Sequence, residues 1–173
     1  EILIMGYNNV NQIKKLIRFD LTQTLISYEY ARKLNQQKEL VKCHLKIDTG
    51  MHRMGYSCEE IEEMSTSFRL PNLQIEGIYT HLCDAENIGI KHVQFTLNQI
   101  GKFYECIDLL KERDIRIPKI HIQSSYGVLN YPKLKCDYAR IGLSLYGIYS
   151  QREEQTVEHP QLHPAMSLYS RVA

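Results

Sequence analysis

Short apolar runs alternate with longer amphipathic stretches along most of the chain. Runs rich in Val, Ile, Leu and Thr are typical of buried strands, whereas apolar residues at helical spacing are typical of helices packed on one face. Strands are predicted over Ile2–Met5, Thr22–Ile26, Val41–Ile47, Ile75–His81, Lys119–Gln123 and Tyr138–Ser144. Helices are predicted over Val10–Arg18, Ser27–Lys38, Glu59–Phe68, Lys91–Arg113 and Tyr126–Leu129.

This alternation is typical of βα units around a parallel sheet. We therefore predict an α/β fold in which the chain forms a partial (β/α)8 TIM-type barrel and supplies about the last six units. The longest predicted helix carries an apolar stripe that we interpret as core packing. The stripe comprises Phe95, Ile100, Phe103, Ile107 and Leu110.

The composition of the sequence changes beyond Gly147, where a polar stretch over 151–155 is followed by Pro160 and Pro164. We predict a barrel over residues 1–149, a linker over 150–160 and the start of a C-terminal β domain over 161–173. Residues 166–172 alternate with period two, which predicts the first strand of that domain. Both ends of the chain are interpreted as cut edges of a longer protein.

Composition narrows the possible functions. The chain has 173 residues, is 43% hydrophobic and carries 21 Lys and Arg against 20 Asp and Glu, with neither sign gathered into a block. This balance argues against nucleic-acid binding, and no apolar run reaches the roughly 20 residues of a membrane-spanning helix. The five cysteines occur singly, without C-x-x-C pairs, so we predict no metal site and expect them to pack as small hydrophobic residues.

Four segments at the predicted strand ends contain candidate catalytic and cofactor-binding residues, since α/β barrels place reactive groups there. The segments are Lys46–Gly55, Thr80-His81, His121–Ser125 and Arg140–Gly147. Taken singly, each has a plain structural explanation: the glycines allow turns, a histidine can be a structural group, and Arg140 can be a solvated charge. Their joint placement favours a binding site.

The four segments also resemble one protein family. Lys46-Ile47-Asp48-Thr49-Gly50-Met51-His52-Arg53-Met54-Gly55 is similar to the LK-[VI]-DTGM-x-R-[LM]-G segment of bacterial alanine racemases, which are pyridoxal-phosphate enzymes of fold type III. Arg140–Gly147 resembles their R-x-G-x-x-LYG motif, Thr80-His81 resembles their strand-end histidine, and 163–166 resembles the entry to their C-terminal β domain. The resemblance implies a racemase that binds pyridoxal 5'-phosphate, acts on an amino acid and forms a homodimer.

The resemblance implies cofactor contacts. Arg140 matches the arginine that hydrogen-bonds the pyridine nitrogen; because it stays protonated, it keeps that nitrogen unprotonated and limits side reactions such as transamination. Ser125, Gly142 and Leu143 match phosphate-binding positions, in agreement with the barrel rule. His121 matches a position near the cofactor, where a structural role is an equal alternative.

The resemblance also implies roles for Arg53, Lys46 and His81. Arg53 matches the arginine near the cofactor's phenolic oxygen and the substrate carboxylate. Lys46 matches a lysine that can be carbamylated and then fixes this arginine. His81 matches a histidine that hydrogen-bonds Arg140 and links it to a tyrosine base. That tyrosine and the Schiff-base lysine are expected outside this chain, so the chain alone is predicted to be inactive.

One departure points to a subfamily. Housekeeping alanine racemases show H-x-x-N-S where this chain has His121-Ile122-Gln123-Ser124-Ser125. This string, with Tyr126-Gly127 and the LNYP that follows, is more similar to the serine/alanine racemases of vancomycin-resistance clusters. In that type a cytoplasmic racemase domain follows a membrane domain, and D-serine supplies peptidoglycan precursors ending in D-Ala-D-Ser. A housekeeping alanine racemase would be cytoplasmic.

Two other functional interpretations of the sequence stay open. A basic amino-acid decarboxylase or D-amino-acid lyase of the same barrel class is possible, but the LYG motif and the predicted tail strand argue against it. A non-catalytic pyridoxal-phosphate protein of this fold is a third possibility, although such single-domain carriers lack a C-terminal β domain. The preference between serine and alanine is left open by these residues.

Overall fold

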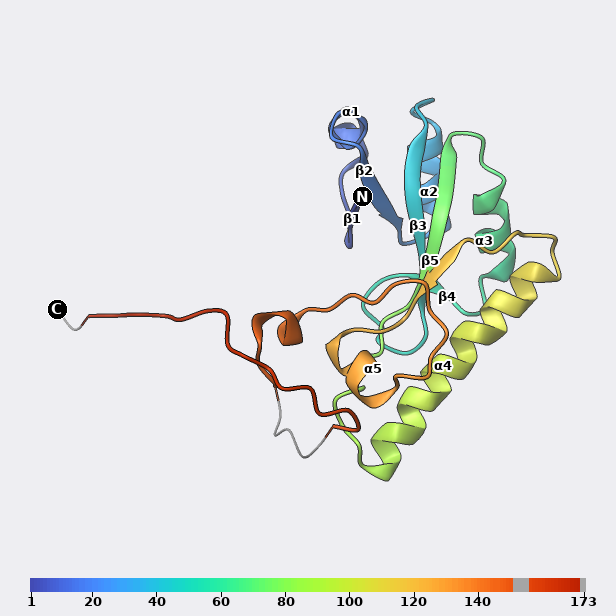
Figure 1. The fold of residues 1–173 in the computed structure, drawn as a ribbon. Coiled ribbons are helices and arrows are strands. Elements are labelled where there is room, and N and C mark those ends of the chain that lie inside the picture. Colours follow the sequence, from blue (N-terminus) through green and yellow to red (C-terminus); the bar gives the residue numbers. More distant parts are fainter. Residues whose placement is uncertain (151–155, 172–173) are drawn as a thin grey trace.

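The computed structural model describes residues 1–150 and 156–171. A curved parallel sheet occupies its centre (Figure 1) and contains β1 (Ile2–Ile4), β2 (Leu21–Leu25), β3 (Val41–Asp48), β5 (Leu73–Tyr79) and β6 (Lys119–His121), in that order. A short strand, β4 (Tyr56–Ser57), pairs with the end of β3. Every pairing is parallel. The described residues therefore form the predicted partial (β/α)8 TIM-type barrel.

Helices connect successive strands, and α3 and α4 lie to the same side of the sheet in Figure 1. The helices are η1 (Val10–Gln12, 3-10), α1 (Ile13–Arg18), α2 (Tyr28–Asn35), α3 (Ile61–Phe68), α4 (Ile90–Lys111), α5 (Ser125–Asn130) and η2 (Leu143–Tyr146, 3-10). Local sequence fixes some of these ends: the Ser27 hydroxyl accepts from the Tyr30 N–H at 3.2 Å and caps α2. All five predicted helices are confirmed with small shifts at their ends, whereas η2 was not predicted.

The central strand β3 has two chemically different faces. Val41, Cys43, Leu45 and Ile47 are at most 1% exposed and belong to the hydrophobic core with residues of α2, α3 and α4. Because side chains alternate along a strand, Lys42, His44, Lys46 and Asp48 face the other way, into the barrel. The outer face thus packs the fold, and the inner face is polar.

The sixth predicted strand, Tyr138–Ser144, is wrong. The backbone N–H of Asp137, just before the segment, donates to Ile120 O in β6, and that of Arg140 donates to Gln123 O just after β6, each at 2.9 Å. These bonds are three residues apart on both segments, whereas a regular parallel ladder repeats every second residue. The chain therefore follows the sheet edge as coil and then turns into η2.

Three smaller predictions also need correction. The strand β4 was not predicted, because two residues are too few for a periodic pattern. Phe95 is 39% exposed and so lies outside the core that the rest of its stripe joins. All five cysteines are free; Cys43 and Cys106 are buried as predicted, but Cys83 is exposed.

The tail strand predicted over 166–172 is not formed in its described part. Residues up to Arg171 are exposed and extended and pair with no described strand, and residue 172 lies outside the described residues. A strand requires hydrogen bonds to a neighbouring strand, which no described segment provides. The β-domain assignment for 161–173 stays a prediction.

Part of the predicted linker is anchored to the barrel. Residues 151–155 lie outside the described part of the chain, but Thr156 is 4% exposed. The backbone N–H of Val157 donates to Asn130 Oδ1 and that of Glu158 donates to Leu129 O, both at 2.9 Å. The segment that leaves the barrel is thus fixed against the end of α5.

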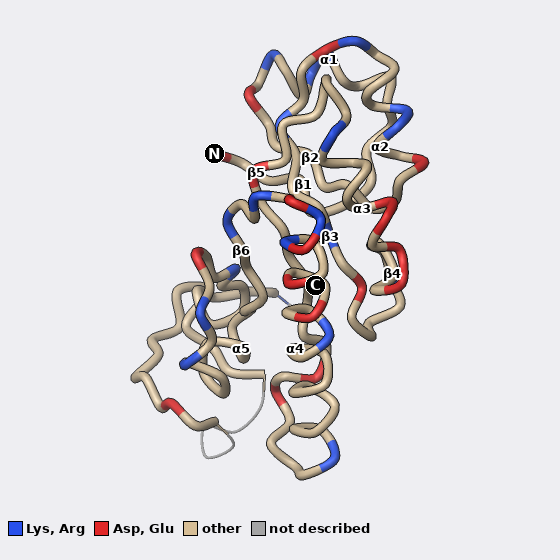
Figure 2. Tube along the Cα trace, turned by 90° about the vertical axis from the view of Figure 1, so that its right-hand side faces the viewer, with Lys and Arg blue, Asp and Glu red and all other residues tan. Residues whose placement is uncertain are grey.

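Residues of both charge signs are spread along the Cα trace (Figure 2), in keeping with the nearly balanced composition. Within residues 1–150 and 156–171, no helix combines the length and the apolar character that crossing a membrane requires.

Candidate active site

The loop after β3 is fixed by the last residue of that strand, Asp48. Asp48 Oδ1 accepts backbone N–H groups from Gly50, Met51 and His52 at 2.9–3.0 Å. Burial opposes ionisation of Asp48, but these hydrogen bonds and the charge of Lys46 outweigh it and lower the pKa of the carboxyl. Gly55 has φ +122°, and a Cβ there would lie 2.9 Å from Lys46 O, so the loop closes tightly on the strand.

Two predicted site residues belong to this loop and its strand. Lys46 is 2% exposed, and its Nζ donates to Met54 O at 2.6 Å. Burial lowers the pKa of Lys46, and the charges of Arg53 and Arg140 lower it further, against the effect of Asp48. Arg53 is exposed at the end of the loop. The structure therefore brings Lys46 within electrostatic reach of both Arg53 and Arg140.

Arg140 is held by four acceptors at the edge of the sheet. Its NH1 donates to His121 Nδ1 at 2.7 Å and to His121 O at 3.0 Å, and its NH2 donates to Thr80 O at 2.7 Å and Ile122 O at 3.2 Å. The remaining donor, Nε, is buried and has no partner among the described residues. Burial lowers the pKa of Arg140 to about 10, so the guanidinium stays protonated at neutral pH.

His121 is fixed in one tautomer by this arrangement. Because Arg140 can only donate, His121 Nδ1 must accept, and the ring proton lies on Nε2. His121 Nε2 therefore donates to His44 Nδ1 at 2.9 Å. Burial, followed by the charge of Arg140, lowers the pKa of His121 to about 3 and keeps the ring neutral.

His44 and Tyr79 were not predicted as site residues. His44 lies over Gly77, where a Cβ would be 2.5 Å from His44 Nδ1. The ring of Tyr79 stacks on His121 with centroids 4.6 Å apart, and the Arg140 guanidinium lies 5.0 Å from the Tyr79 ring centroid. A signal for His44 was present, since polar residues recur at every second position of an otherwise buried strand.

His81 lies near the group but is not bonded as predicted. Among the hydrogen bonds of the described residues none joins His81 to Arg140: the terminal nitrogens of Arg140 bind His121, Thr80 and Ile122, and its Nε has no partner. His81 Nδ1 is buried without a partner. Burial lowers the pKa of His81 to about 4, and the charges of Arg140, Arg53 and Lys46 add to the effect.

The predicted phosphate-binding residues lie together beside α5. Ser125 is 6% exposed, and its Oγ accepts the backbone N–H groups of Gly142 at 3.0 Å and Ser144 at 3.3 Å. Leu143 lies between these two residues at the start of η2. An anion would bind here by accepting the Ser125 hydroxyl hydrogen and by taking over the two N–H groups that now donate to Ser125 Oγ.

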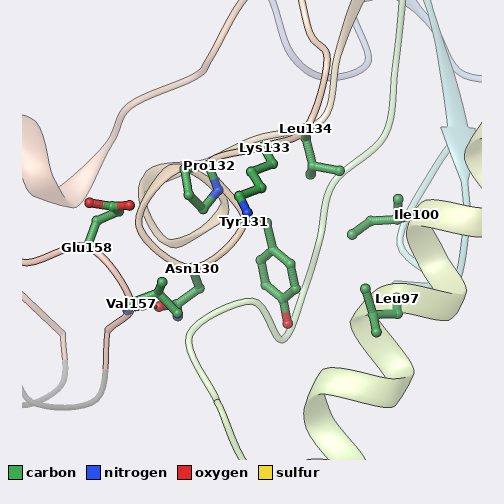
Figure 3. A pocket seen from close by; sticks show the side chains of 9 residues that line it. All are labelled: Leu97, Ile100, Asn130, Tyr131, Pro132, Lys133, Leu134, Val157 and Glu158. Carbon is green, nitrogen blue, oxygen red and sulfur yellow. Dashed lines mark hydrogen bonds between the residues drawn. The ribbon is translucent and has the colours of Figure 1, made fainter.

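Two hollows help to locate the site. A cavity of about 330 Å³ adjoins the histidine and arginine group and is lined in part by His44, His121, Tyr138 and Arg140. A more apolar hollow of about 580 Å³ lies between α4 and the segments 130–134 and 157–158 (Figure 3). Of the predicted site residues, His121 and Arg140 line the first hollow and none lines the second.

Comparison with known proteins agrees with this geometry. The chain is 41% identical over 172 residues to an amino-acid racemase of Enterococcus faecalis and 40% identical over 171 residues to a serine/alanine racemase of Enterococcus gallinarum. Each alignment covers 99% of this chain but 24% of the relative, so the chain spans about a quarter of their length. The alanine racemase of Clostridium difficile 630 has a similar structure, with TM-score 0.84 and 27% identity over 94% of this chain and 46% of that one.

The match to a family model covers the part of the barrel that this chain contains. The model describes the N-terminal domain of alanine racemase and matches residues 1–150, which include Lys46, Arg53, His81, Ser125 and Arg140. The chain therefore belongs to the alanine racemase N-terminal domain family.

Proposed function

We propose that this chain is part of a pyridoxal-phosphate-dependent racemase that interconverts the L and D forms of serine, alanine or both. The observation that carries the proposal is the state of Arg140. A protonated, largely buried guanidinium has its terminal nitrogens bound to four acceptors and keeps a buried Nε–H without a partner. A ring nitrogen that carries a lone pair suits this remaining donor.

The residues beside Arg140 fit pyridoxal phosphate. Arg140 would hold the pyridine nitrogen and keep it unprotonated. Ser125, Gly142 and Leu143 would hold the phosphate, and the Ser144 N–H, which already points at Ser125 Oγ, would join them. When bound, the cofactor supplies an electron sink for a proton leaving the amino acid's α-carbon.

The remaining residues would orient and neutralise the reactants. Arg53 would bind the substrate carboxylate, since its planar fork matches two anionic oxygens. Lys46, which the fold already disfavours as a cation, would be carbamylated and hold Arg53 in place. His121 would support Arg140, while His81 would shift to connect Arg140 to a tyrosine base outside this chain.

In this proposal the site accepts serine at a rate comparable to that for alanine. The string HIQSSYG and the relative named serine/alanine racemase support it. In this version the complete protein is a membrane protein with a cytoplasmic racemase domain, acts as a homodimer and supplies D-serine for peptidoglycan precursors in vancomycin resistance. A cytoplasmic alanine racemase is the alternative.

The test compares kcat/KM for L-serine and L-alanine, using the complete protein from membrane and soluble fractions. Burying the serine hydroxyl without a partner would cost about ten- to a hundredfold in rate, so a site adapted to serine should show comparable values for both substrates. A soluble enzyme that prefers alanine more than about a hundredfold would favour the alternative. Absence of racemisation with every amino acid would contradict the proposal itself.

A further inference from the structure

A glutamine on the longest helix contacts both loops that carry the candidate site. Gln99 lies in α4 and is 1% exposed. Its Nε2 donates to Thr49 Oγ1 and to His81 O, both at 3.3 Å, and its Oε1 accepts the Cys83 backbone N–H at 3.2 Å. The amide thus uses both donors and its oxygen on residues that follow β3 and β5.

These contacts continue towards the arginines of the site. Thr49 Oγ1 lies 2.9 Å from Thr80 Oγ1, and Thr80 O accepts from Arg140 NH2 at 2.7 Å. On the other side, Thr49 follows Asp48, whose carboxylate fixes the loop that ends at Arg53. One side chain therefore touches the start of the Arg53 loop and the backbone of His81.

The Arg53 loop also lies directly against α4. Gly50 has φ +141°, and a Cβ there would be 3.4 Å from Phe95 Cζ and 3.7 Å from Gln99 Nε2. This backbone conformation is one that L side chains rarely adopt. The close approach gives the Gln99 amide its contact with Thr49, since a bulkier residue at 50 would push the loop away from the helix.

We infer that Gln99 is a positioning residue, which sets the distance between the Arg53 loop and His81. The catalytic roles of Arg53 and His81 rest on the proposed function. The hydrogen bonds by which Gln99 joins the two loops, here called the Gln99 clamp, do not. Carboxylate binding by Arg53 and the orientation of His81 depend on loop geometry, and small displacements in an active site cost large factors in rate. Loss of Gln99 should therefore act mainly on KM and kcat/KM for the amino acid.

Three variants of the complete protein separate this role from simple core packing. Gln99→Leu keeps the approximate size and removes every hydrogen bond. Gln99→Glu keeps an acceptor for the Cys83 N–H but offers no N–H to Thr49 or His81 O at neutral pH. Gln94→Leu is the matched control, because Gln94 is an exposed residue of the same helix.

Hydrogen exchange is measured on peptides covering 49–53 and 81–84, without substrate or added pyridoxal phosphate. Gln99→Leu should exchange about tenfold faster in both peptides. Gln99→Glu should raise the exchange rate in peptide 49–53 but keep the Cys83 amide protected. Gln94→Leu should exchange at the wild-type rate in both peptides. With the cofactor bound, Gln99→Leu should raise KM for the amino acid about tenfold or more.

Unchanged exchange in both peptides of Gln99→Leu would overturn the inference. So would faster exchange throughout the barrel, since Gln99 would then be a general core residue. Because the exchange test needs neither turnover nor cofactor, a protein without racemase activity that still shows the predicted pattern would refute the proposed function and keep the clamp.

Discussion

The two faces of β3 contrast sharply although they alternate residue by residue. On the outer face Cys43, Leu45 and Ile47 are fully buried in an apolar core, where only size and shape matter. On the inner face His44 and Lys46 are almost as well buried, at 3% and 2% exposed, but they face polar groups. Burial alone therefore does not distinguish the residues that hold the fold from those that hold the site.

What distinguishes the faces is whether polar groups are fully paired. An outer-face residue leaves no hydrogen-bonding group to satisfy. The inner group leaves buried atoms without partners, among them Arg140 Nε and His81 Nδ1. Unpaired buried polar atoms cost free energy. Hydroxyls such as those of Ser65 and Thr96 are also unpaired elsewhere in the described residues, but Arg140 lines the cavity of about 330 Å³, where a polar ligand would pair with its free donor.

The largest effect on stability is expected on the outer face. Leu45→Ala should lower the free energy of unfolding by about 2–5 kcal/mol, because it removes a fully buried side chain from the centre of the core. Urea unfolding of the complete protein measures this. A loss below about 0.5 kcal/mol would mean that the outer face is not the core of the fold.

A glycine on the inner face should give the next effect. Gly77→Ala places a Cβ 2.5 Å from His44 Nδ1, so the imidazole must move and its hydrogen bond with His121 breaks. Overpacking of this kind costs about 1–3 kcal/mol. Gly101→Ala is the control, since nothing lies within 4 Å of its added Cβ, and on a helix it should not destabilise. Equal stability of the two variants would contradict the tight inner packing.

The inner histidines should make stability depend on pH. The pKa of His81 is lowered to about 4 and that of His121 to about 3, whereas an unfolded histidine titrates near 6.5. Their contribution is complete above pH 6.5 and is lost as the pH falls towards 4 and then 3, because the unfolded chain takes up protons first.

Most carboxylates stay ionised between pH 6.5 and 5, so this window reports the histidines. We expect the free energy of unfolding to fall there by about 1 kcal/mol for each histidine, after allowance for partial exposure. Urea midpoints of the wild type and of His81→Asn measure the slope, which should be shallower in the variant. A flat profile in the wild type would show that the histidines are not held neutral.

The smallest effect on stability is expected at Lys42, at the solvent-exposed end of the inner face of β3. Lys42 Nζ pairs with Asp20 Oδ1 at 2.7 Å, but both side chains are well exposed. Surface pairs contribute little, so Lys42→Ala should leave the urea midpoint unchanged within error. A clear loss of stability would mean that the polar face supports the fold as strongly as the apolar face does.

Sequence patterns correctly predicted the elements whose apolar residues recur at a clear helical or strand period. The helix that became α4 and the strand that became β3 are long enough for their apolar spacing to be clear, and the motif segments placed Arg53 after β3 and Ser125 after β6. Arg140 was predicted within a sixth strand, but it lies in coil. Residues 138–144 have the apolar content of a strand, but their register against β6 slips, and no local pattern encodes that slip.

Pairings between distant residues could not be predicted. The tautomer of His121 depends on His44 and Arg140, which are far from it in sequence. Gln99 occupies a polar position beside an apolar stripe, which in sequence looks like any helix surface residue. Only the fold brings its amide to the loops after β3 and β5.

The central claim, that Arg140 with its free Nε is the cofactor's partner, is tested most directly by the absorbance spectrum of the complete protein with pyridoxal phosphate. Arg140→Gln should alter the spectrum, add long-wavelength absorbance when an amino acid is present, and lower racemisation of L-serine and L-alanine by about 10²–10³-fold. Gln94→Leu, on the exposed face of α4, should match the wild type. A spectrum and a rate unchanged in Arg140→Gln would contradict the account.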